Sequence, residues 1–209
     1  MFYKGKKRDE DVSKIQDCDF HGHGDLIREE VSERITEAVR GTADPSGGLK
    51  VLDVGTGYGK TAALLANVIN EKSKIWTIDP SSDVLENARN VLKEKGLEKR
   101  LEFVQASAED LHAFDSEFFD IIVSVMVLHH IVALRPALKE MERVLKSKKG
   151  RIILSDWSHE AHELPFESGH KHEDFFGLKE INEEIKGLEL TTTFSKEFDY
   201  WYIVELTKS

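Results

Sequence analysis

The sequence predicts an α/β protein with a mostly parallel sheet, an antiparallel last strand and helices on both faces. From Lys50 onward, short apolar runs alternate with helix-like stretches, which is the βαβ pattern of a parallel sheet covered by helices. The last two β-rich runs are separated by only five residues. That spacing permits a hairpin and excludes the longer crossover that parallel neighbours need.

The N-terminal part of the chain is predicted to form a flap followed by one helix. Residues 1–24 are polar with mixed charge and show no sustained period. Apolar residues then recur every four positions and predict an amphipathic helix that ends near Gly41, namely Ile27, Val31, Ile35 and Val39. Residues 42–48 contain the Pro and Gly of a linker. We therefore expect a flap and helix over 1–48 and a single sheet domain over 49–209.

The elements of the sheet domain follow in order. Strands are predicted at 50–54, 74–78, 101–104, 119–125 and 151–154. Helices are predicted between them at 60–69, 83–94 and 134–145. After Asp156, a polar, histidine-rich connection runs to Phe176 and precedes a short helix at 178–185 and strands at 188–194 and 200–206.

Composition and charge exclude several classes of protein. Of 209 residues, 40% are hydrophobic and 33% charged, which predicts one water-soluble domain with a sizeable core. The 29 basic and 39 acidic residues leave a net charge of -10, which disfavours general electrostatic binding to nucleic acid or to an anionic membrane. Cys18 is the single cysteine, and neither a secretory signal nor a membrane span is apparent. These features predict a cytoplasmic protein.

A glycine-rich turn follows the first predicted strand. Residues 53–59 read Asp-Val-Gly-Thr-Gly-Tyr-Gly and precede a helix, so backbone N–H groups can approach a ligand. A phosphate-binding P-loop would need glycine where Val54 stands, and a dinucleotide fingerprint would need glycine where Lys60 stands. A tight turn without a ligand is the remaining alternative.

The second strand ends in a carboxylate. Asp79 lies about 20 residues beyond the glycine turn, where an acidic side chain can accept hydrogen bonds from both hydroxyls of a ribose. The alternative role for Asp79 is to cap the helix that begins near Asp83. Ser81 or Ser82 could cap that helix equally well, which would leave Asp79 available.

Four segments in the same order resemble the class I S-adenosylmethionine (SAM) methyltransferases. The Asp-x-Gly-x-Gly-x-Gly pattern resembles their first motif, and residues 105–111 resemble their adenine segment, with Ser107 where Asp is often found. Residues 119–130 resemble the fourth-strand motif of small-molecule methyltransferases, including the ubiquinone and menaquinone biosynthesis type. Residues 134–150 resemble the helix and turn before the fifth strand. The resemblance covers about residues 49–157 and implies a Rossmann-like, seven-stranded sheet with a reversed last strand.

The resemblance also implies a cofactor site at the carboxyl ends of the strands, with SAM as the cofactor. The methionine end is expected at Asp53, Gly55, Gly57 and Gly59. The ribose is expected at Asp79 with Pro80. The adenine side is expected at Ser107, Ala108 and Glu109, and the floor of the site at Ser124.

Histidines supply the candidate bases. Most of the nine histidines follow the fourth and fifth strands or lie in the N-terminal segment. If the methyl acceptor must lose a proton, the candidate catalytic residues are His129, His130 and His172. The alternative is that histidines collect in solvated loops. The His-x-His pairs at 21/23 and 170/172 are also candidates for a metal site, because imidazoles bind metal ions. Their spacing matches no zinc motif, and no metal ligand is assigned.

The sequence thus predicts a SAM-dependent methyltransferase that acts on a small-molecule acceptor. The alternatives are an RNA or protein methyltransferase and a SAM- or metal-binding module without turnover, with an NAD-binding reductase third. The prediction includes no membrane partner, disfavours a nucleic-acid partner and leaves the oligomeric state open.

Overall fold

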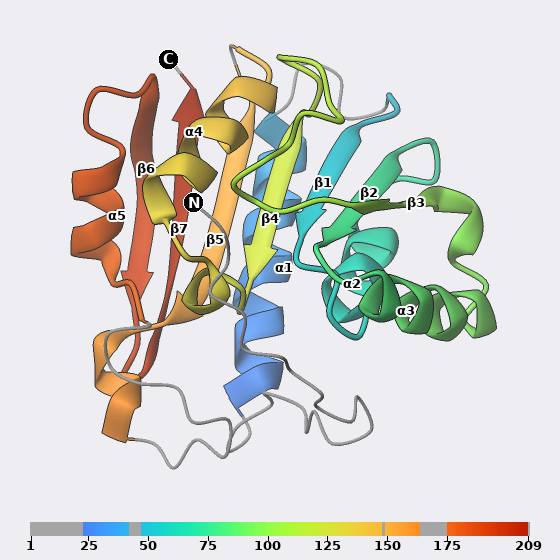
Figure 1. Ribbon diagram of the computed structural model, residues 1–209, viewed down its shortest axis with the longest axis horizontal. Helices are drawn as coiled ribbons and strands as arrows, with labels where there is room; N and C mark the ends of the chain where they lie inside the picture. Colours follow the sequence, from blue (N-terminus) through green and yellow to red (C-terminus); the bar gives the residue numbers. More distant parts are fainter. Residues whose placement is uncertain (1–22, 42–46, 148, 164–174, 209) are drawn as a thin grey trace.

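A computed structural model of the chain describes residues 23–41, 47–147, 149–163 and 175–208. Its centre is a seven-stranded sheet with the order β3-β2-β1-β4-β5-β7-β6 (Figure 1). The strands are β1 (Lys50–Val54), β2 (Lys74–Asp79), β3 (Leu101–Gln105), β4 (Ile121–Val125), β5 (Arg151–Trp157), β6 (Leu190–Glu197) and β7 (Trp201–Lys208). β1 to β5 are parallel, and β7 is antiparallel to both β5 and β6. The predicted fold class, including the reversed last strand, is confirmed.

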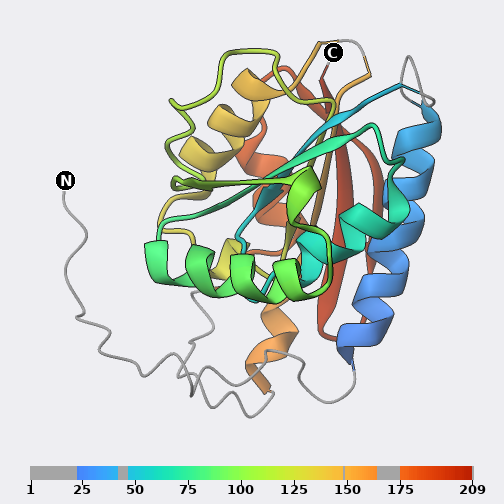
Figure 2. The ribbon, with the colours of Figure 1, turned by 90° about the vertical axis from the view of Figure 1, so that its right-hand side faces the viewer.

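Helices cover both faces of this sheet (Figure 2). One face packs against α1 (His23–Gly41), α2 (Lys60–Val68) and α3 (Ser82–Glu94), and the other against α4 (Leu134–Val144) and α5 (Leu178–Glu184). Three short 3-10 helices complete the described elements, namely η3 (Glu98–Arg100), η4 (Leu128–His130) and η5 (His159–Glu163). Each face has its own cluster of buried apolar side chains, as the alternation of side chains along a strand requires.

Helix α1 packs as the amphipathic pattern predicts. Ile27, Val31 and Ile35 are buried in the same apolar cluster as α2. The Arg34 guanidinium, on the same helix, donates a hydrogen bond to the Glu205 carboxylate of β7 at 3.1 Å. The helix is therefore fastened to the sheet by apolar burial and by an ion pair. The division of the chain at residue 48 remains a prediction.

Several predicted boundaries were wrong by a few residues. α1 begins at His23, within the predicted flap, and β4 begins at Ile121 because Phe119 instead bridges Leu145. The polar connection expected after Asp156 begins later, because β5 continues to Trp157. There it pairs with Trp201 of β7, which prolongs β5 beyond Ser155, the last residue that pairs with β4.

The sheet places five loops on one edge. Because β1 to β5 are parallel, their carboxyl ends meet at the same edge, which is the lower edge in Figure 1. The chain order reverses at β1, whose neighbours are β2 and β4. Ligands of open α/β sheets bind at this switch point. In the described part of the chain, no helix combines the length and apolar character needed to cross a bilayer.

Candidate active site

The glycine turn after β1 has the backbone that only glycine adopts readily. Gly55, Gly57 and Gly59 have φ angles of 86°, 46° and 76°, all in the left-handed region. A Cβ atom on Gly55 would lie 2.3 Å from Val127 Cγ2, and one on Gly59 would lie 2.8 Å from Leu92 Cδ1. A Cβ on Gly57 would meet nothing within 4 Å. The outer two glycines are thus required by packing, whereas Gly57 faces open space.

A chain of hydrogen bonds supports this turn from below. Thr77 Oγ1 donates to Asp53 Oδ2 at 2.7 Å and lies 2.7 Å from Thr56 Oγ1. All three side chains are buried. Burial raises the pKa of Asp53 and the Thr77 hydrogen bond lowers it, and the net pKa is about 7. The other carboxyl oxygen of Asp53 has no hydrogen-bond partner among the described residues. Asp53 therefore lies beneath the turn and supports it from inside the protein.

Asp79 lies at the end of β2 beside the turn. Its Oδ2 is 3.4 Å from the Gly57 N–H, and its Oδ1 accepts a hydrogen bond from the Ser81 N–H at 3.0 Å. Ser81 caps α3 through the Val84 N–H at 3.3 Å, so Asp79 does not have that role. Partial burial raises the pKa of Asp79, while the two N–H groups lower it. Pro80 follows on the exposed side of the edge.

The expected adenine segment forms a compact turn after β3. Ser107 Oγ donates to the Glu109 carboxylate, whose other oxygen accepts the Val132 N–H at 3.0 Å. Ala108, which lies between these two residues in the sequence, is buried. Glu109 therefore joins the loop after β3, where the adenine side is expected, to the loop after β4.

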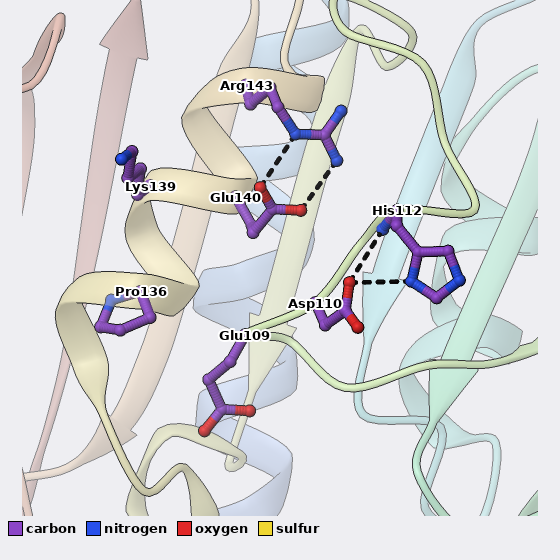
Figure 3. Close-up of a pocket in the computed structure, with 7 residues that line it drawn as sticks. All are labelled: Glu109, Asp110, His112, Pro136, Lys139, Glu140 and Arg143. Atoms are coloured by element: carbon purple, nitrogen blue, oxygen red, sulfur yellow. Dashed lines mark hydrogen bonds and ion pairs between the residues drawn. The ribbon is translucent and has the colours of Figure 1, made fainter. Parts of the chain in front are cut away.

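A shallow pocket lies on the outer side of this segment (Figure 3). It encloses about 530 Å³ and is lined by Glu109, Asp110 and His112 of the loop and by Pro136, Lys139, Glu140 and Arg143 of α4. The Arg143 guanidinium donates to Glu140 and to the carbonyl oxygens of Leu111 and Phe114. The charged groups of this pocket are thus largely paired with one another, and the cofactor is expected at the glycine turn instead.

Ser124 lies on β4, level with Val54 of β1. Its side chain is on the sheet face of Ile122, which packs toward α4. The side chain is buried, and its hydroxyl has no hydrogen-bond partner in the part of the chain that the structure describes. An expected cofactor residue thus presents an unsatisfied polar atom near the carboxyl edge.

His129 and Asp156 form a buried pair at the ends of β4 and β5. His129 Nδ1 is 2.6 Å from Asp156 Oδ1, and the side chains are each 1% exposed. Asp156 also accepts hydrogen bonds from the backbone N–H groups of Trp157 at 2.7 Å and His129 at 3.3 Å. Burial would raise the pKa of Asp156, but the charge and hydrogen bond of His129 and the Trp157 N–H outweigh it, so the pKa is lowered.

The three candidate bases are placed differently. His129 is buried, which argues against the solvated-loop alternative for this residue. His130 is exposed, with its ring centroid 4.1 Å from that of His129. His172 lies outside the described residues, as do His21 and His170 of the His-x-His pairs. Among the described side chains, no group of three or more His, Cys, Asp or Glu residues is arranged to hold a metal ion.

Two residues of this edge were missed by the sequence prediction. Thr77 belongs to an apolar strand, and nothing in its spacing indicates a bond to Asp53. Asp156 carries a signal that could have been used, because it is an acid at the end of a strongly apolar strand. Its partner His129 follows the neighbouring strand.

The fold and this edge define a class of protein, the Rossmann-like nucleotide-cofactor proteins that bind at a glycine turn. Within that class, a family model described as "Methyltransferase domain" matches residues 45–202. The chain belongs to this methyltransferase domain family.

Curated relatives agree with the family. The chain is 33% identical over 128 residues to the ubiquinone/menaquinone biosynthesis C-methyltransferase UbiE of Shewanella sp. (strain W3-18-1), covering 60% of this chain and 50% of that protein. It is 32% identical over 117 residues to the UbiE protein of Shewanella frigidimarina, covering 56% of this chain and 46% of that protein. The chain thus spans about half the length of the curated relatives it matches.

Solved structures share the fold at low identity. A SAM-dependent methyltransferase from Aquifex aeolicus has a TM-score of 0.71 at 20% identity, covering 93% of this chain and 95% of that one. The [4+2]-cyclase SpnF has a TM-score of 0.66 at 17% identity, covering 84% and 81%. Because a cyclase also has this fold, the fold alone does not decide the reaction.

The family and fold imply SAM as the cofactor, and the residues of the edge fit it. Gly57 leaves space for a ligand against the backbone, and Asp79 presents a carboxylate beside that space. Asp53 and Ser124 each have a buried oxygen without a partner among the described residues, near the ends of β1 and β4 but on opposite faces of the sheet.

Proposed function

We propose that this protein transfers a methyl group from SAM to a small-molecule acceptor. The observation that supports the proposal is one shared edge of the sheet. It presents a glycine turn open at Gly57 after β1, and a buried pair formed by His129, which follows β4, and Asp156, near the end of β5. The first feature suits a cofactor, and the second suits removal of a proton from the acceptor.

In this proposal each expected cofactor residue has a defined place. The turn of Gly55, Gly57 and Gly59 receives the methionine end, supported by Asp53 through Thr77 and Thr56. Asp79 accepts the ribose hydroxyls. The turn of Ser107, Ala108 and Glu109 borders the adenine, and Ser124 lies below. Bound SAM supplies a methyl group on a positively charged sulfur, so the protein contributes alignment more than bond chemistry.

His129 is the proposed base. The pKa of Asp156 is lowered and its Oδ1 lies 2.6 Å from His129 Nδ1, so in this proposal Asp156 accepts the Nδ1 proton and orients the ring. Nε2 is then the basic atom that takes the proton from the acceptor. The same logic orients the base in hydrolase triads, where a buried carboxylate holds the histidine.

The small-molecule acceptor is supported by charge and by the relatives. A net charge of -10 opposes a broad nucleic-acid surface. The UbiE relatives are named for methylation in quinone biosynthesis, which involves small molecules. We also propose a cytoplasmic location, which rests on the sequence composition.

The test uses SAM labelled with tritium in the methyl group and cell extract fractionated by size. We expect label in a small-molecule fraction. The variant His129→Gln should lower transfer by about 100-fold or more with SAM affinity unchanged, because general base catalysis contributes at least this factor. The exposed His112 provides the control His112→Gln, which should retain transfer. Label found only in RNA or protein would favour the other methyltransferase alternatives, and SAM binding without any labelling would favour a binding module.

A further inference from the structure

Tyr202 has a buried hydroxyl beside the proposed base pair. It lies on β7 directly opposite Asp156 of β5. Its side chain is on the α4 and α5 face of the sheet and is fully buried at 0% exposure. Its hydroxyl has no hydrogen-bond partner among the side chains and backbone groups described.

An unpartnered buried hydroxyl requires an explanation, because buried polar atoms are nearly always hydrogen-bonded. A neighbouring residue shows the usual situation. Ser155, also buried on β5, donates its hydroxyl to the Tyr202 carbonyl oxygen at 2.9 Å. A phenylalanine at position 202 would fill nearly the same volume without burying a polar atom. The hydroxyl of Tyr202 is therefore costly to the fold unless another group binds it.

Two carboxylates act electrostatically on the Tyr202 hydroxyl, those of Asp156 and Glu180. Asp156 from β5 lies on one side, held by His129. Glu180 from α5 is hydrogen-bonded to the Gly177 N–H at 3.0 Å and to His159 Nε2 at 3.1 Å. The His159 and Glu180 side chains are 33% and 38% exposed, whereas Asp156 is buried.

These carboxylates also limit what can bind. Burial raises the pKa of Tyr202 well above its ordinary value, and the charges of Asp156 and Glu180 raise it further. The phenol therefore remains a hydrogen-bond donor. An anionic partner at the same place would be repelled by both carboxylates. An uncharged oxygen or nitrogen with a lone pair is the chemistry that suits the position.

We propose that Tyr202 belongs to the methyl-acceptor site and donates its hydroxyl hydrogen bond to an uncharged oxygen or nitrogen of the acceptor. This inference rests on the proposed function and adds a substrate-positioning residue to it. Tyr202 orients the acceptor toward His129, and its hydroxyl, which has no partner among the described residues, makes that contact.

The test compares Tyr202→Phe with Ser155→Ala, which removes a buried hydroxyl that has a partner. Thermal unfolding, calorimetry with S-adenosylhomocysteine and tritium transfer to the size fraction labelled by the wild-type protein are measured for both. We expect Tyr202→Phe to unfold at the wild-type temperature or above it and to bind S-adenosylhomocysteine normally. Its kcat/KM should fall about tenfold, as expected for one lost hydrogen bond to substrate. Ser155→Ala should unfold at a lower temperature and retain its kcat/KM.

Each other outcome contradicts the proposal. A lower unfolding temperature for Tyr202→Phe would show that the hydroxyl has a structural partner. An unchanged kcat/KM would show that it does not meet the acceptor. If the wild-type protein labels no fraction, the proposed function fails first, which distinguishes that failure from a failure at Tyr202 alone.

Discussion

Three aspartates at the carboxyl edge differ in pKa because their surroundings differ. Burial raises the pKa of Asp53 to about 7, and partial burial raises that of Asp79. Asp156 is as deeply buried as Asp53, yet the neighbouring His129 lowers its pKa. One residue type thus supports the glycine turn at Asp53 and, in the proposed function, contacts the ribose at Asp79 and orients the base at Asp156.

Asp79 provides a direct test of the cofactor site. The change Asp79→Ala should weaken SAM binding by about 1.5–3 kcal/mol, because the hydrogen bonds that the carboxylate accepts from the ribose hydroxyls are lost. Calorimetry with SAM measures the effect, and circular dichroism checks the fold. Asp83→Ala, in the first turn of α3, is the matched control and should bind normally. Equal affinity in the two variants would remove Asp79 from the ribose position.

The raised pKa of Asp53 predicts a pH-dependent stability. Because the folded pKa of about 7 exceeds the ordinary value of 3.8, the native state retains a proton that the unfolded chain has lost. Stability relative to Asp53→Asn should therefore be greatest below pH 4. It should fall by up to about 1.4 kcal/mol per pH unit as the pH rises toward 7. Urea unfolding of both proteins from pH 5 to 8 measures this difference, and parallel curves would show that Asp53 ionises normally.

At the scale of the element, the glycine turn joins β1 to α2 under two constraints. The Gly55 and Thr56 N–H groups both donate to the Ile78 carbonyl oxygen at 2.9 Å, which ties the turn to the end of β2. Gly55 packs against Val127 of the loop after β4, and Gly59 packs against Leu92 of α3. Packing on both sides therefore holds the turn in a shape that leaves Gly57 exposed.

The three glycines should accordingly respond differently to alanine. Gly55→Ala should destabilise the fold by about 2–5 kcal/mol, from its clash with Val127 and its left-handed backbone. Gly57→Ala should lower the free energy of unfolding by only about 1–2 kcal/mol, because only its left-handed backbone is strained. Its new methyl group should occupy the space proposed for SAM. Urea unfolding and calorimetry with S-adenosylhomocysteine separate the two effects. Normal affinity in Gly57→Ala would show that the ligand does not approach this position.

At the scale of the whole molecule, the sheet brings the two halves of the proposed site together. Because β4 and β5 continue the sheet on the far side of β1 from β2, the cofactor residues and the His129–Asp156 pair lie along one edge. Strands β6 and β7 extend the sheet beyond β5 and place Tyr202 beside Asp156. A ligand at this edge contacts loops from several strands and should stabilise the protein as a unit.

Ligand-dependent stability tests the identity of the cofactor. At 100 times its dissociation constant, a ligand stabilises the native state by about 2.7 kcal/mol. For a domain of this size, that corresponds to a rise of roughly 5–10 °C in Tm. We expect such a rise with SAM and with S-adenosylhomocysteine, and none with NAD, in differential scanning calorimetry. A rise with NAD alone would identify a dinucleotide-binding protein instead.

Much of the fold could be predicted from the sequence, and so could the glycine turn and Asp79 of the proposed site, because these signals are contiguous. Glycines at alternate positions after an apolar strand indicate a ligand turn, and Asp79 ends the next strand. Apolar runs and helical periods locate nearly all strands and helices. The short spacing between the last two strands predicts that β7 is antiparallel. Strand ends were less certain, since Trp157 extends β5 only because Trp201 pairs with it.

The contacts that distinguish one residue from its neighbours depended on the tertiary structure. His129 and Asp156 are 27 residues apart, and Asp53 and Thr77 are 24 apart. Tyr202 meets Asp156 only through the antiparallel register of β7 with β5. Local patterns determine which elements form, because each apolar period acts within its own segment. Strand pairing and burial decide which polar groups share a dry edge, and these arise only when the whole sheet assembles.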